Sequence, residues 1–352
     1  MKKYNNRLRG KDMKPGDFVI AQIRHQETTP VPYTLQFDSD ELMAKLDLAY
    51  QYQGLSWRDR MVPYMKTVTT VIDFDCQEMI DASHYQDAFG TIWRYDMGAP
   101  HIESPGLREP SLAKYQFPEP AVFINEKKRQ AALDSCRDQP DSFLYAWAGR
   151  GIFERSWTIR GMENMLMDIV LEQDFYEELL DRITSLYLEF IKVMGTMPMD
   201  AIAFGDDWGD QRGIIVGPER WRKIFKPRVA KMFESIHKQG MYTMNHCCGN
   251  VSEIIPDLIE IGLDVLESVQ PEAMNPYELK KKWGDKLTFW GGIGSQSIIP
   301  FGSPQAIQAE IKHLCQDMGR GGGYILAPSK GLQPDTPVEN AMAMIETFNN
   351  QS

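Results

Sequence analysis

Cysteine is scarce in this chain of 352 residues, and its five cysteines form an odd-numbered set. They are Cys76, Cys136, Cys247, Cys248 and Cys315. So few cysteines argue against a disulfide framework and favour a reducing compartment. The first residues carry positive charge, but no apolar stretch follows them, so the sequence predicts no signal peptide. We therefore expect a cytoplasmic protein.

Long hydrophobic runs and excess basic charge are also missing. No uncharged apolar run approaches the roughly 20 residues that cross a bilayer, so we expect a soluble protein with no membrane segment. Lys and Arg number 38 against 49 Asp and Glu, which gives a formal net charge of −11. Because a nucleic-acid surface needs a net positive face, we expect no nucleic-acid partner and predict a small-molecule substrate.

A glycine-rich phosphate loop near the start, which an open doubly wound sheet would more often carry, is absent too. The clearest glycine cluster, at 321–323, precedes a predicted strand and is interpreted as a turn. Short apolar strands alternate with helical patterns along the rest of the chain. The predicted strands span 90–95, 142–148, 200–204, 241–245, 264–267, 286–290 and 323–327. The predicted helices span 38–52, 162–194 (two helices), 218–238, 251–261, 276–282, 304–318 and 337–348.

This alternation predicts an α/β fold with a parallel sheet and helices outside it. Seven strands, with an eighth hidden in the first third, favour a closed (β/α)8 barrel, or TIM barrel. We interpret residues 1–35 as an N-terminal arm and residues 36–352 as the barrel. The Pro- and Gly-rich stretch 98–120 is predicted to be a long loop.

In such a barrel the chemistry gathers where the strands end. His246 and Cys248 follow a predicted strand two residues apart, so in extended backbone they face the same side. Imidazole and thiolate together suit Zn²⁺. A buried cysteine pair beside a hydrogen-bonded histidine would give the same local sequence. No other His or Cys lies at a predicted strand end.

Carboxylates follow two other strands. Asp206 and Asp207 are adjacent and repel, so one of them can have a raised pKa and act as an acid or base. Either can instead hold a metal or a substrate hydroxyl, cap the following turn or pair with an arginine. Glu154 and Arg155 form either an internal ion pair or a substrate contact. The aromatic residues Trp147, Trp157, Trp208 and Trp290 are predicted as walls, which suit a flat ring. The other polar candidates for substrate contact are Gln211, Gln270, Ser329 and Lys330.

Several motifs extend the pattern beyond the histidine and cysteine. They are HCCG at 246–249, IIPD at 254–257, GLD at 262–264, FWGGI at 289–293, GGYIL at 322–326 and PDTPVEN at 334–340. With them the chain, over roughly residues 85–350, resembles the uroporphyrinogen decarboxylase-like superfamily, closest to its corrinoid- and coenzyme-M-linked methyltransferases. That resemblance implies a (β/α)8 barrel, in agreement with the strand count.

The sequence departs from both branches of the superfamily. The decarboxylases grip substrate carboxylates with an N-terminal motif of paired arginines and glycine, but residues 29–34 here read TPVPYT. The zinc methyltransferases add a cysteine after the last strand, where residues 327–331 here read APSKG. The resemblance therefore implies zinc on His246 and Cys248, completed by an oxygen ligand such as Glu267 or Asp207. Lys330 is then expected to attract an anionic substrate group.

The resemblance implies a methyltransferase that moves a methyl group between a small methylated compound and a corrinoid protein or thiol. Because the chain has no cobalamin signature, a corrinoid would arrive on a partner protein. Asp206 and Asp207 would handle protons or polarise the substrate, while Glu154 and Gln211 would position it. One alternative is a metal-free decarboxylase or lyase that uses Glu154, Arg155 and the aspartate pair. Another is a non-catalytic protein that binds a small molecule or a corrinoid protein.

Overall fold

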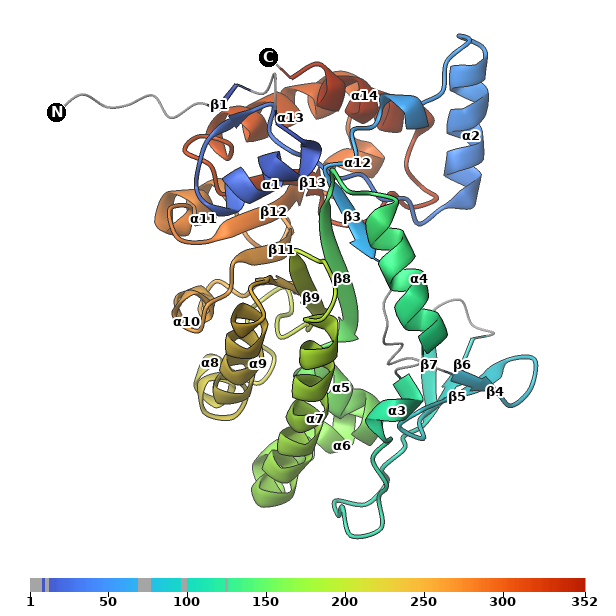
Figure 1. The fold of residues 1–352 in the computed structure, drawn as a ribbon, viewed down its shortest axis with the longest axis vertical. Helices are drawn as coiled ribbons and strands as arrows, with labels where there is room; N and C mark the ends of the chain where they lie inside the picture. The colour runs from blue at the N-terminus through green and yellow to red at the C-terminus, as the bar shows by residue number, and fades with distance from the viewer. Residues whose placement is uncertain (1–7, 10–12, 69–76, 96–99, 124–125, 352) are drawn as a thin grey trace, which may run out of the picture.

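A computed structural model describes residues 8–9, 13–68, 77–95, 100–123 and 126–351. Its centre is a curled parallel sheet of seven strands in the order β13-β12-β11-β10-β9-β8-β3 (Figure 1). The strands are β3 (Met65–Val68), β8 (Phe143–Arg150), β9 (Ala201–Gly205), β10 (Tyr242–His246), β11 (Val265–Val269), β12 (Thr288–Ile293) and β13 (Tyr324–Pro328). The last six match predicted strands and are mostly buried, as parallel strands covered on both faces are.

The segment 32–37 extends the barrel wall beyond β13. Tyr33 bridges Leu326 in parallel. The Thr34 amide donates to the Leu326 carbonyl at 2.9 Å, and the Leu326 amide donates to the Pro32 carbonyl at 2.9 Å. The predicted α/β barrel is thus confirmed, with this segment and β3 supplying the walls that come from the first third. Neither is predicted individually, because each is too short to show a period.

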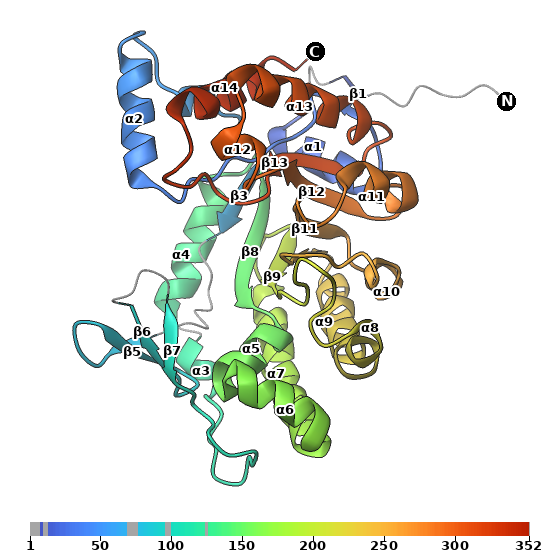
Figure 2. The same ribbon diagram turned by 180° about the vertical axis from the view of Figure 1, so that it is seen from behind.

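Helices surround the sheet (Figures 1 and 2). They are α1 (Pro15–Ile23), α2 (Asp40–Gln51), α3 (Pro120–Phe123), α4 (Glu126–Arg137), α5 (Ile152–Arg160), α6 (Met162–Leu171), α7 (Gln173–Met194), α8 (Pro218–Arg220), α9 (Lys226–Lys238), α10 (Ile255–Glu260), α11 (Pro276–Trp283), α12 (Ile298–Phe301), α13 (Pro304–Asp317) and α14 (Val338–Asn349). Each predicted helix is present. The one predicted over 218–238 is interrupted by a π-helical turn at Trp221–Phe225. No described helix is both long and apolar enough to cross a membrane.

The region that the sequence indicates as an N-terminal arm contains α1, which packs onto the barrel. Phe18 and Val19 are buried. The Gly16 amide donates to the Asp141 carbonyl and the Gly323 amide donates to the Gln22 carbonyl, both at 2.8 Å. A Cβ at Gly16 would lie 2.6 Å from the Phe143 nitrogen, so glycine allows this close approach. From residue 13 onward, this region is therefore part of the barrel's packing. The two-stranded pair β1 (Leu8–Arg9) and β2 (Thr28–Thr29) also belongs to this region.

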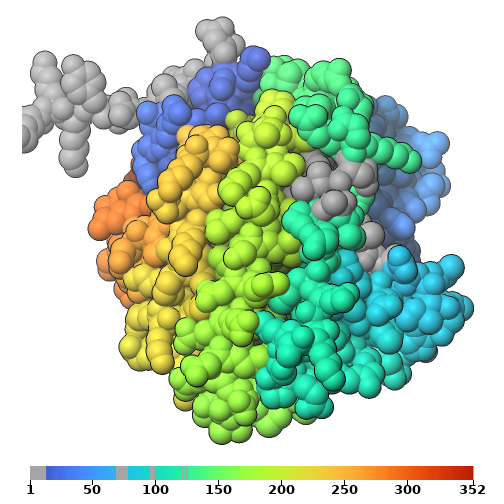
Figure 3. Space-filling view, turned by 60° about the horizontal axis from the view of Figure 1, so that its bottom comes forward, coloured from blue at the N-terminus to red at the C-terminus, as the bar shows by residue number. Residues whose placement is uncertain are grey.

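The stretch of chain that connects β3 to β8 forms a small antiparallel sheet, which lies beside the barrel (Figure 2). It consists of β4 (Gln77–Met79), β5 (His84–Asp87), β6 (Ile92–Arg94) and β7 (His101–Ser104). The predicted strand 90–95 is β6, but it belongs to this antiparallel sheet and not to the barrel, where the sequence predicts it. In addition, β7 falls inside the stretch 98–120, which the sequence predicts to be a loop. The Thr91 hydroxyl donates to the Thr158 carbonyl at 3.0 Å. Figure 3 shows this sheet, in cyan and teal, against the green segment that carries α5 to α7.

Cys136, Cys247, Cys248 and Cys315 form no disulfide, as the sequence predicts, and Cys76 lies outside the described residues.

Candidate functional site

The carboxyl ends of three neighbouring strands bring the predicted site residues together. In the parallel register His246 at the end of β10 pairs with Gly205 of β9 on one side and with Glu267 of β11 on the other. The Asp206 amide continues the ladder, donating to the His246 carbonyl at 2.9 Å. Adjacent strands therefore place the two aspartates, the histidine and Glu267 at one mouth of the barrel.

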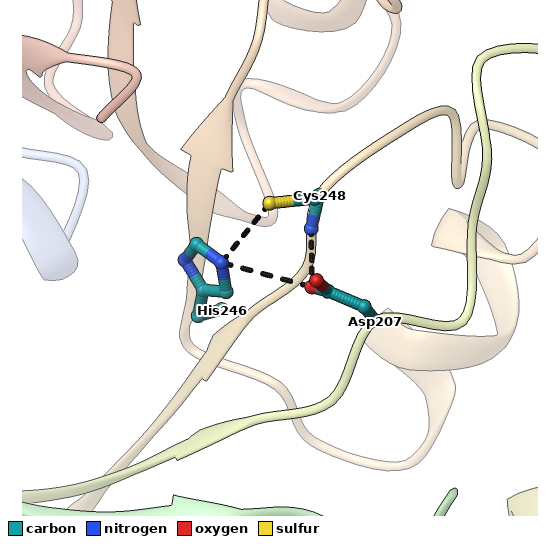
Figure 4. Close-up of side chains that lie close together, drawn as sticks. All are labelled: Asp207, His246 and Cys248. Carbon is teal, nitrogen blue, oxygen red and sulfur yellow. Dashed lines mark hydrogen bonds and ion pairs between the residues drawn. The ribbon is translucent and has the colours of Figure 1, made fainter. Parts of the chain in front are cut away.

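Three ligand atoms of different chemistry meet at this mouth (Figure 4). The His246 Nε2 atom lies 3.3 Å from the Cys248 Sγ atom and 3.6 Å from the Asp207 Oδ1 atom. All three ligand atoms lie within 4.8 Å of one another, and each side chain is half-buried. An imidazole, a thiolate and a carboxylate at this spacing are the donor types that hold zinc.

Backbone contacts hold the two loops that carry this cluster. The Cys248 amide donates to Asp207 Oδ1 at 2.7 Å. The Asn250 amide donates to the Asp210 carbonyl at 2.7 Å. Gly249 has a φ of +77°, and a Cβ there would lie 2.6 Å from the Gly209 carbonyl. Only glycine allows this conformation and this approach without strain, so the loop after β10 crosses the loop after β9 at close range.

Glu267 contacts the other nitrogen of the histidine. Its carboxylate forms a short hydrogen bond with His246 Nδ1. Burial alone would lower the pKa of His246, but the charge of Glu267 and the hydrogen bonds to Cys248 and Glu267 raise it well above its usual value. With Nδ1 engaged by Glu267, the Nε2 atom is left to face Cys248 and Asp207. The sequence leaves the oxygen ligand open between Glu267 and Asp207, and this geometry favours Asp207.

Asp206 has a different environment from its neighbour. Its residue is 2 % exposed, whereas the Asp207 side chain is 36 % exposed. Its carboxylate accepts from the Glu154 amide at 2.8 Å and from the Trp208 indole nitrogen at 2.9 Å. The Phe153 amide also donates to it, at 3.2 Å. Burial raises the pKa of Asp206, although these donors oppose the shift. Asp206 therefore accepts hydrogen bonds from the first backbone amides of α5, as an N-terminal cap does, and it also holds the Trp208 side chain in place.

Glu154, in the first turn of α5, is the carboxyl group most suited to proton transfer. Burial and the nearby charge of Asp207 raise its pKa to about 7, although Arg150, His246 and Arg155 oppose the shift. A carboxyl group with such a pKa can hold or release a proton near neutral pH. The Glu154 carboxyl thus interacts electrostatically with Asp207 and His246, although Glu154 is not among the residues that line the cavity beside His246.

A cavity of about 420 Å³ opens next to the histidine. Trp290, Ser329 and Lys330 line it together with His246 and Glu267, as the sequence predicts for a mouth formed by strand ends. Ser329 is buried, and its hydroxyl donates to the Ser295 hydroxyl at 3.0 Å. Lys330 is exposed at the cavity wall.

Four other predicted contact residues lie away from this cavity's lining. Arg155 is fully buried, with its Nε atom 3.2 Å from the Tyr187 hydroxyl and its guanidinium over the Phe89 ring. Arg155 thus forms an internal ion pair with the buried Asp87, at 4.0 Å. The others are Trp208, which packs against Trp221, the buried Gln270, and Gln211, which is exposed on the loop after β9.

The cavity also contains residues that the sequence does not single out. Gln36 and Asp38 come from the N-terminal segment, Thr67 from β3 and Tyr145 from β8. No local pattern marks the first three, because only the curl of the sheet brings these distant parts of the chain to the site. Strand alternation could have indicated Tyr145, since it lies two residues before Trp147 and shares its face.

The chain matches one family model and is similar in sequence to several curated proteins. The family model for uroporphyrinogen decarboxylase (URO-D) matches residues 156–351. The methylcobamide:CoM methyltransferase MtaA of Methanosarcina barkeri is 29 % identical over 176 residues, 50 % of this chain and 49 % of that protein. The uroporphyrinogen decarboxylase of Geobacter sulfurreducens is 21 % identical over 179 residues, 51 % of this chain and 50 % of that protein. The chain thus spans about half the length of the curated relatives it matches.

A solved structure shows the same fold over nearly the whole chain. A methyltransferase from Methanosarcina mazei has a TM-score of 0.69 and 18 % sequence identity, and the match covers 96 % of this chain and 98 % of that one. Asp207, His246, Cys248 and Glu267 all lie inside the region that the family model matches.

Proposed function

The chain belongs to the uroporphyrinogen decarboxylase family, and within that family we propose that it is a methyltransferase. It would move a methyl group between a small methylated compound and a corrinoid protein or thiol. The observation that carries this proposal is the cluster of Asp207, His246 and Cys248, with its ligand atoms within 4.8 Å of one another. The similarity to a methylcobamide:CoM methyltransferase supports it.

The donor set fits zinc. Cys248 would supply a thiolate, His246 its Nε2 atom and Asp207 a carboxylate oxygen, and three protein ligands are the number typical of catalytic zinc sites. When bound, zinc would supply a Lewis acid that keeps a thiol deprotonated near neutral pH. Glu267 would orient the imidazole through Nδ1, as carboxylates commonly do behind a metal-bound histidine.

The protein's own groups would position the reactants and handle protons. In the transfer, a nucleophile forms a bond to the methyl carbon while the bond from that carbon to the donor atom breaks, and the electron pair of the broken bond stays on the leaving atom. A thiol acceptor loses its proton as its sulfur is methylated. An oxygen or nitrogen leaving atom takes up a proton, whereas the cobalt of a methylcorrinoid donor takes up none. Glu154, with a pKa of about 7, is the group that would give or receive such a proton. A corrinoid carried by a partner protein would approach the open mouth.

The direct test of the activity uses methylcobalamin as methyl donor and 2-mercaptoethanesulfonate as thiol acceptor. We expect loss of methylcobalamin absorbance matched by one methyl thioether formed per methyl group lost. If this thiol, other small thiols and small methylated donors with a corrinoid acceptor all give no transfer above the uncatalysed rate, the proposal is wrong.

The orientation of the histidine gives a quantitative prediction. Glu267→Gln removes the charge that fixes His246, so zinc affinity should fall by about 10- to 100-fold. Competition with a chromophoric chelator measures the dissociation constant. Glu278→Gln, at an exposed position in α11, is the matched control and should leave it unchanged. Unchanged zinc affinity in Glu267→Gln would show that this carboxylate plays no part behind the metal.

Ser329 occupies the segment in which the related zinc enzymes supply a further cysteine, and it lines the cavity with His246. Ser329→Cys should therefore tighten zinc binding, by about tenfold, since a thiolate is a far better zinc ligand than a hydroxyl. The same chelator competition measures the change. Ser295→Cys is the control, because Ser295 is hydrogen-bonded to Ser329 but is not among the residues that line this cavity. No tightening in Ser329→Cys would count against a metal site here.

One observation favours a second function, a decarboxylase without metal. When a carbon–carbon bond breaks and CO₂ leaves, the remaining carbanion needs a proton, and Glu154 is poised to supply one. Its pKa is raised from 4.5 to about 7, so the donor form exists below pH 7 and is lost as the pH rises through 7. Decarboxylation should then fall above pH 7.

The pH profile and a metal chelator separate this second function from the first. Glu154→Gln should lower a decarboxylation rate by at least about a hundredfold and abolish its fall near pH 7. The exposed Glu163→Gln should alter neither. Full activity after metal removal would favour the decarboxylase, and an unaltered profile in Glu154→Gln would exclude Glu154 as the proton donor.

A further inference from the structure

A tryptophan in the cavity is exposed where a buried strand residue would be expected. Residues 143–146 and Ala148 of β8 are buried, whereas Trp147 is 37 % exposed. Its ring lies edge-on to the His246 ring, with centroids 6.0 Å apart. The neighbouring Gly205 makes room for it, because a Cβ there would come 3.1 Å from the indole. Leaving a large aromatic side chain uncovered forgoes hydrophobic stabilisation, so this position points to a ligand that covers the ring.

Two further aromatic rings in the cavity have their polar groups already engaged. The Trp290 indole nitrogen donates to the Thr34 hydroxyl at 2.8 Å. The Tyr145 hydroxyl is hydrogen-bonded to Thr67, and burial raises the pKa of Tyr145 to about 12. Both residues line the same cavity as Trp147. Because their hydrogen-bonding groups are satisfied within the protein and each residue is only 4 % exposed, Trp290 and Tyr145 add apolar wall to the cavity beside Trp147.

The charged side chains that line the cavity differ in whether they have a partner within the protein. Glu267 is hydrogen-bonded to His246. Asp38 accepts a hydrogen bond of 2.6 Å from the side-chain nitrogen of Gln333. The Lys330 ammonium, in contrast, makes no hydrogen bond or ion pair with any residue that the structure describes. A ligand in this cavity therefore meets an ammonium group without a described partner, beside the carboxylates of Asp38 and Glu267, and an anionic group is the natural partner for that ammonium.

From this combination we infer that the cavity binds a flat aromatic anion. Its ring packs on Trp147, its acidic group reaches Lys330, and its remaining substituent points toward His246 and Cys248. A volume of about 420 Å³ lies within the range of small-ligand pockets and suits a molecule of one or two rings. The inference names the substrate class of the proposed methyltransferase and in that sense rests on it, although binding itself requires neither methyl transfer nor metal.

Isothermal titration calorimetry with three probes tests the inference on the chain of 352 residues. The probes are 4-methoxybenzoate, its uncharged analogue methoxybenzene, and the non-planar cyclohexanecarboxylate. We expect 4-methoxybenzoate to bind at least about tenfold more tightly than either of the others, since only it combines ring and charge. Equal affinities, or tighter binding of methoxybenzene, would overturn the inference.

Variants then assign the two contacts. Lys330→Gln should weaken 4-methoxybenzoate about tenfold and leave methoxybenzene unchanged. Trp147→Leu should weaken both aromatic probes, and Trp147→Phe should restore most of the loss. Lys281→Gln and Trp283→Phe, both on α11, are the controls and should change nothing. If Lys330→Gln binds 4-methoxybenzoate as the unaltered protein does, the anion is not held as inferred.

The inference and the proposed function fail in different ways. Protein stripped of metal with a chelator still has Trp147 and Lys330, so it should bind 4-methoxybenzoate with nearly unchanged affinity. Retained binding without methyl transfer by the unaltered protein would support the aromatic site and refute the methyltransferase. Methyl transfer without any preference for the aromatic acid would refute the aromatic site alone.

Discussion

Replacing Cys248 by serine is expected to remove bound zinc and to lower methyl transfer by at least about a hundredfold. A serine hydroxyl is a poor zinc ligand, so the variant keeps only the imidazole of His246 and the carboxylate of Asp207, too few donors to hold a structural or catalytic zinc tightly. Elemental analysis of protein purified without chelator gives the zinc content per chain, and the methylcobalamin assay gives the rate.

The matched control for this variant is Cys315→Ser on α13. Cys315 is also a half-buried free cysteine, but its Sγ atom lies near Gln351 rather than near the cluster, at 3.6 Å from the side-chain oxygen. Cys315→Ser should keep its zinc and its activity. Full zinc occupancy in Cys248→Ser would contradict the assignment of the thiolate as a ligand.

Replacing Asp206 by alanine is expected to destabilise the fold by about 3–5 kcal/mol. The change leaves three buried donors, the Phe153 and Glu154 amides and the Trp208 indole, without their acceptor. Each unsatisfied buried donor costs about 1–3 kcal/mol, and these costs overlap because the three donors share one acceptor. Urea unfolding followed by circular dichroism measures the loss.

The neighbouring Asp207→Ala should have the opposite profile. Asp207 is partly exposed and accepts a single described hydrogen bond, from the Cys248 amide. Its removal should change the free energy of unfolding of the metal-free protein by less than about 1 kcal/mol, while zinc affinity falls. If Asp206→Ala proved as stable as the unaltered protein, the role of Asp206 as the cap of α5 would be wrong. If Asp207→Ala kept its zinc affinity, Asp207 would not be a ligand.

Local patterns were sufficient to predict most of the barrel. From β8 onward each strand is a short apolar run, and a segment with helical spacing of apolar residues follows it. Few folds other than a parallel sheet covered by helices are compatible with that alternation. The site's position followed from the same argument. Because strand ends converge in a barrel, the spacing of His246 and Cys248 placed both side chains at one mouth together with Asp207.

Features that depend on distant parts of the chain were not predictable in this way. The segment 32–37 extends the barrel wall through a bridge to Leu326, and nothing within its six residues indicates that partner. Asp206 and Asp207 are the same residue type at adjacent positions, and only the packing of α5 onto the loop after β9 makes one a buried cap. The register between β10 and β11, which pairs His246 with Glu267, is likewise not visible in either strand alone.

The resemblance to a known superfamily added what local physics could not. The motifs from residue 246 onward indicated the superfamily, and the match of the family model over residues 156–351 confirms it. The missing cysteine at 327–331 suggested an oxygen ligand, and the proximity of Asp207 to the histidine and cysteine supplies a candidate with the required chemistry.

X-ray absorption at the zinc edge of the purified protein tests the central claim most directly. The account predicts one sulfur ligand at about 2.3 Å, from Cys248, and nitrogen and oxygen ligands at about 2.0–2.2 Å, from His246, Asp207 and one substrate or water. A protein that binds no zinc when zinc is supplied, or a zinc shell with no sulfur or with two, would contradict a centre built from these three residues.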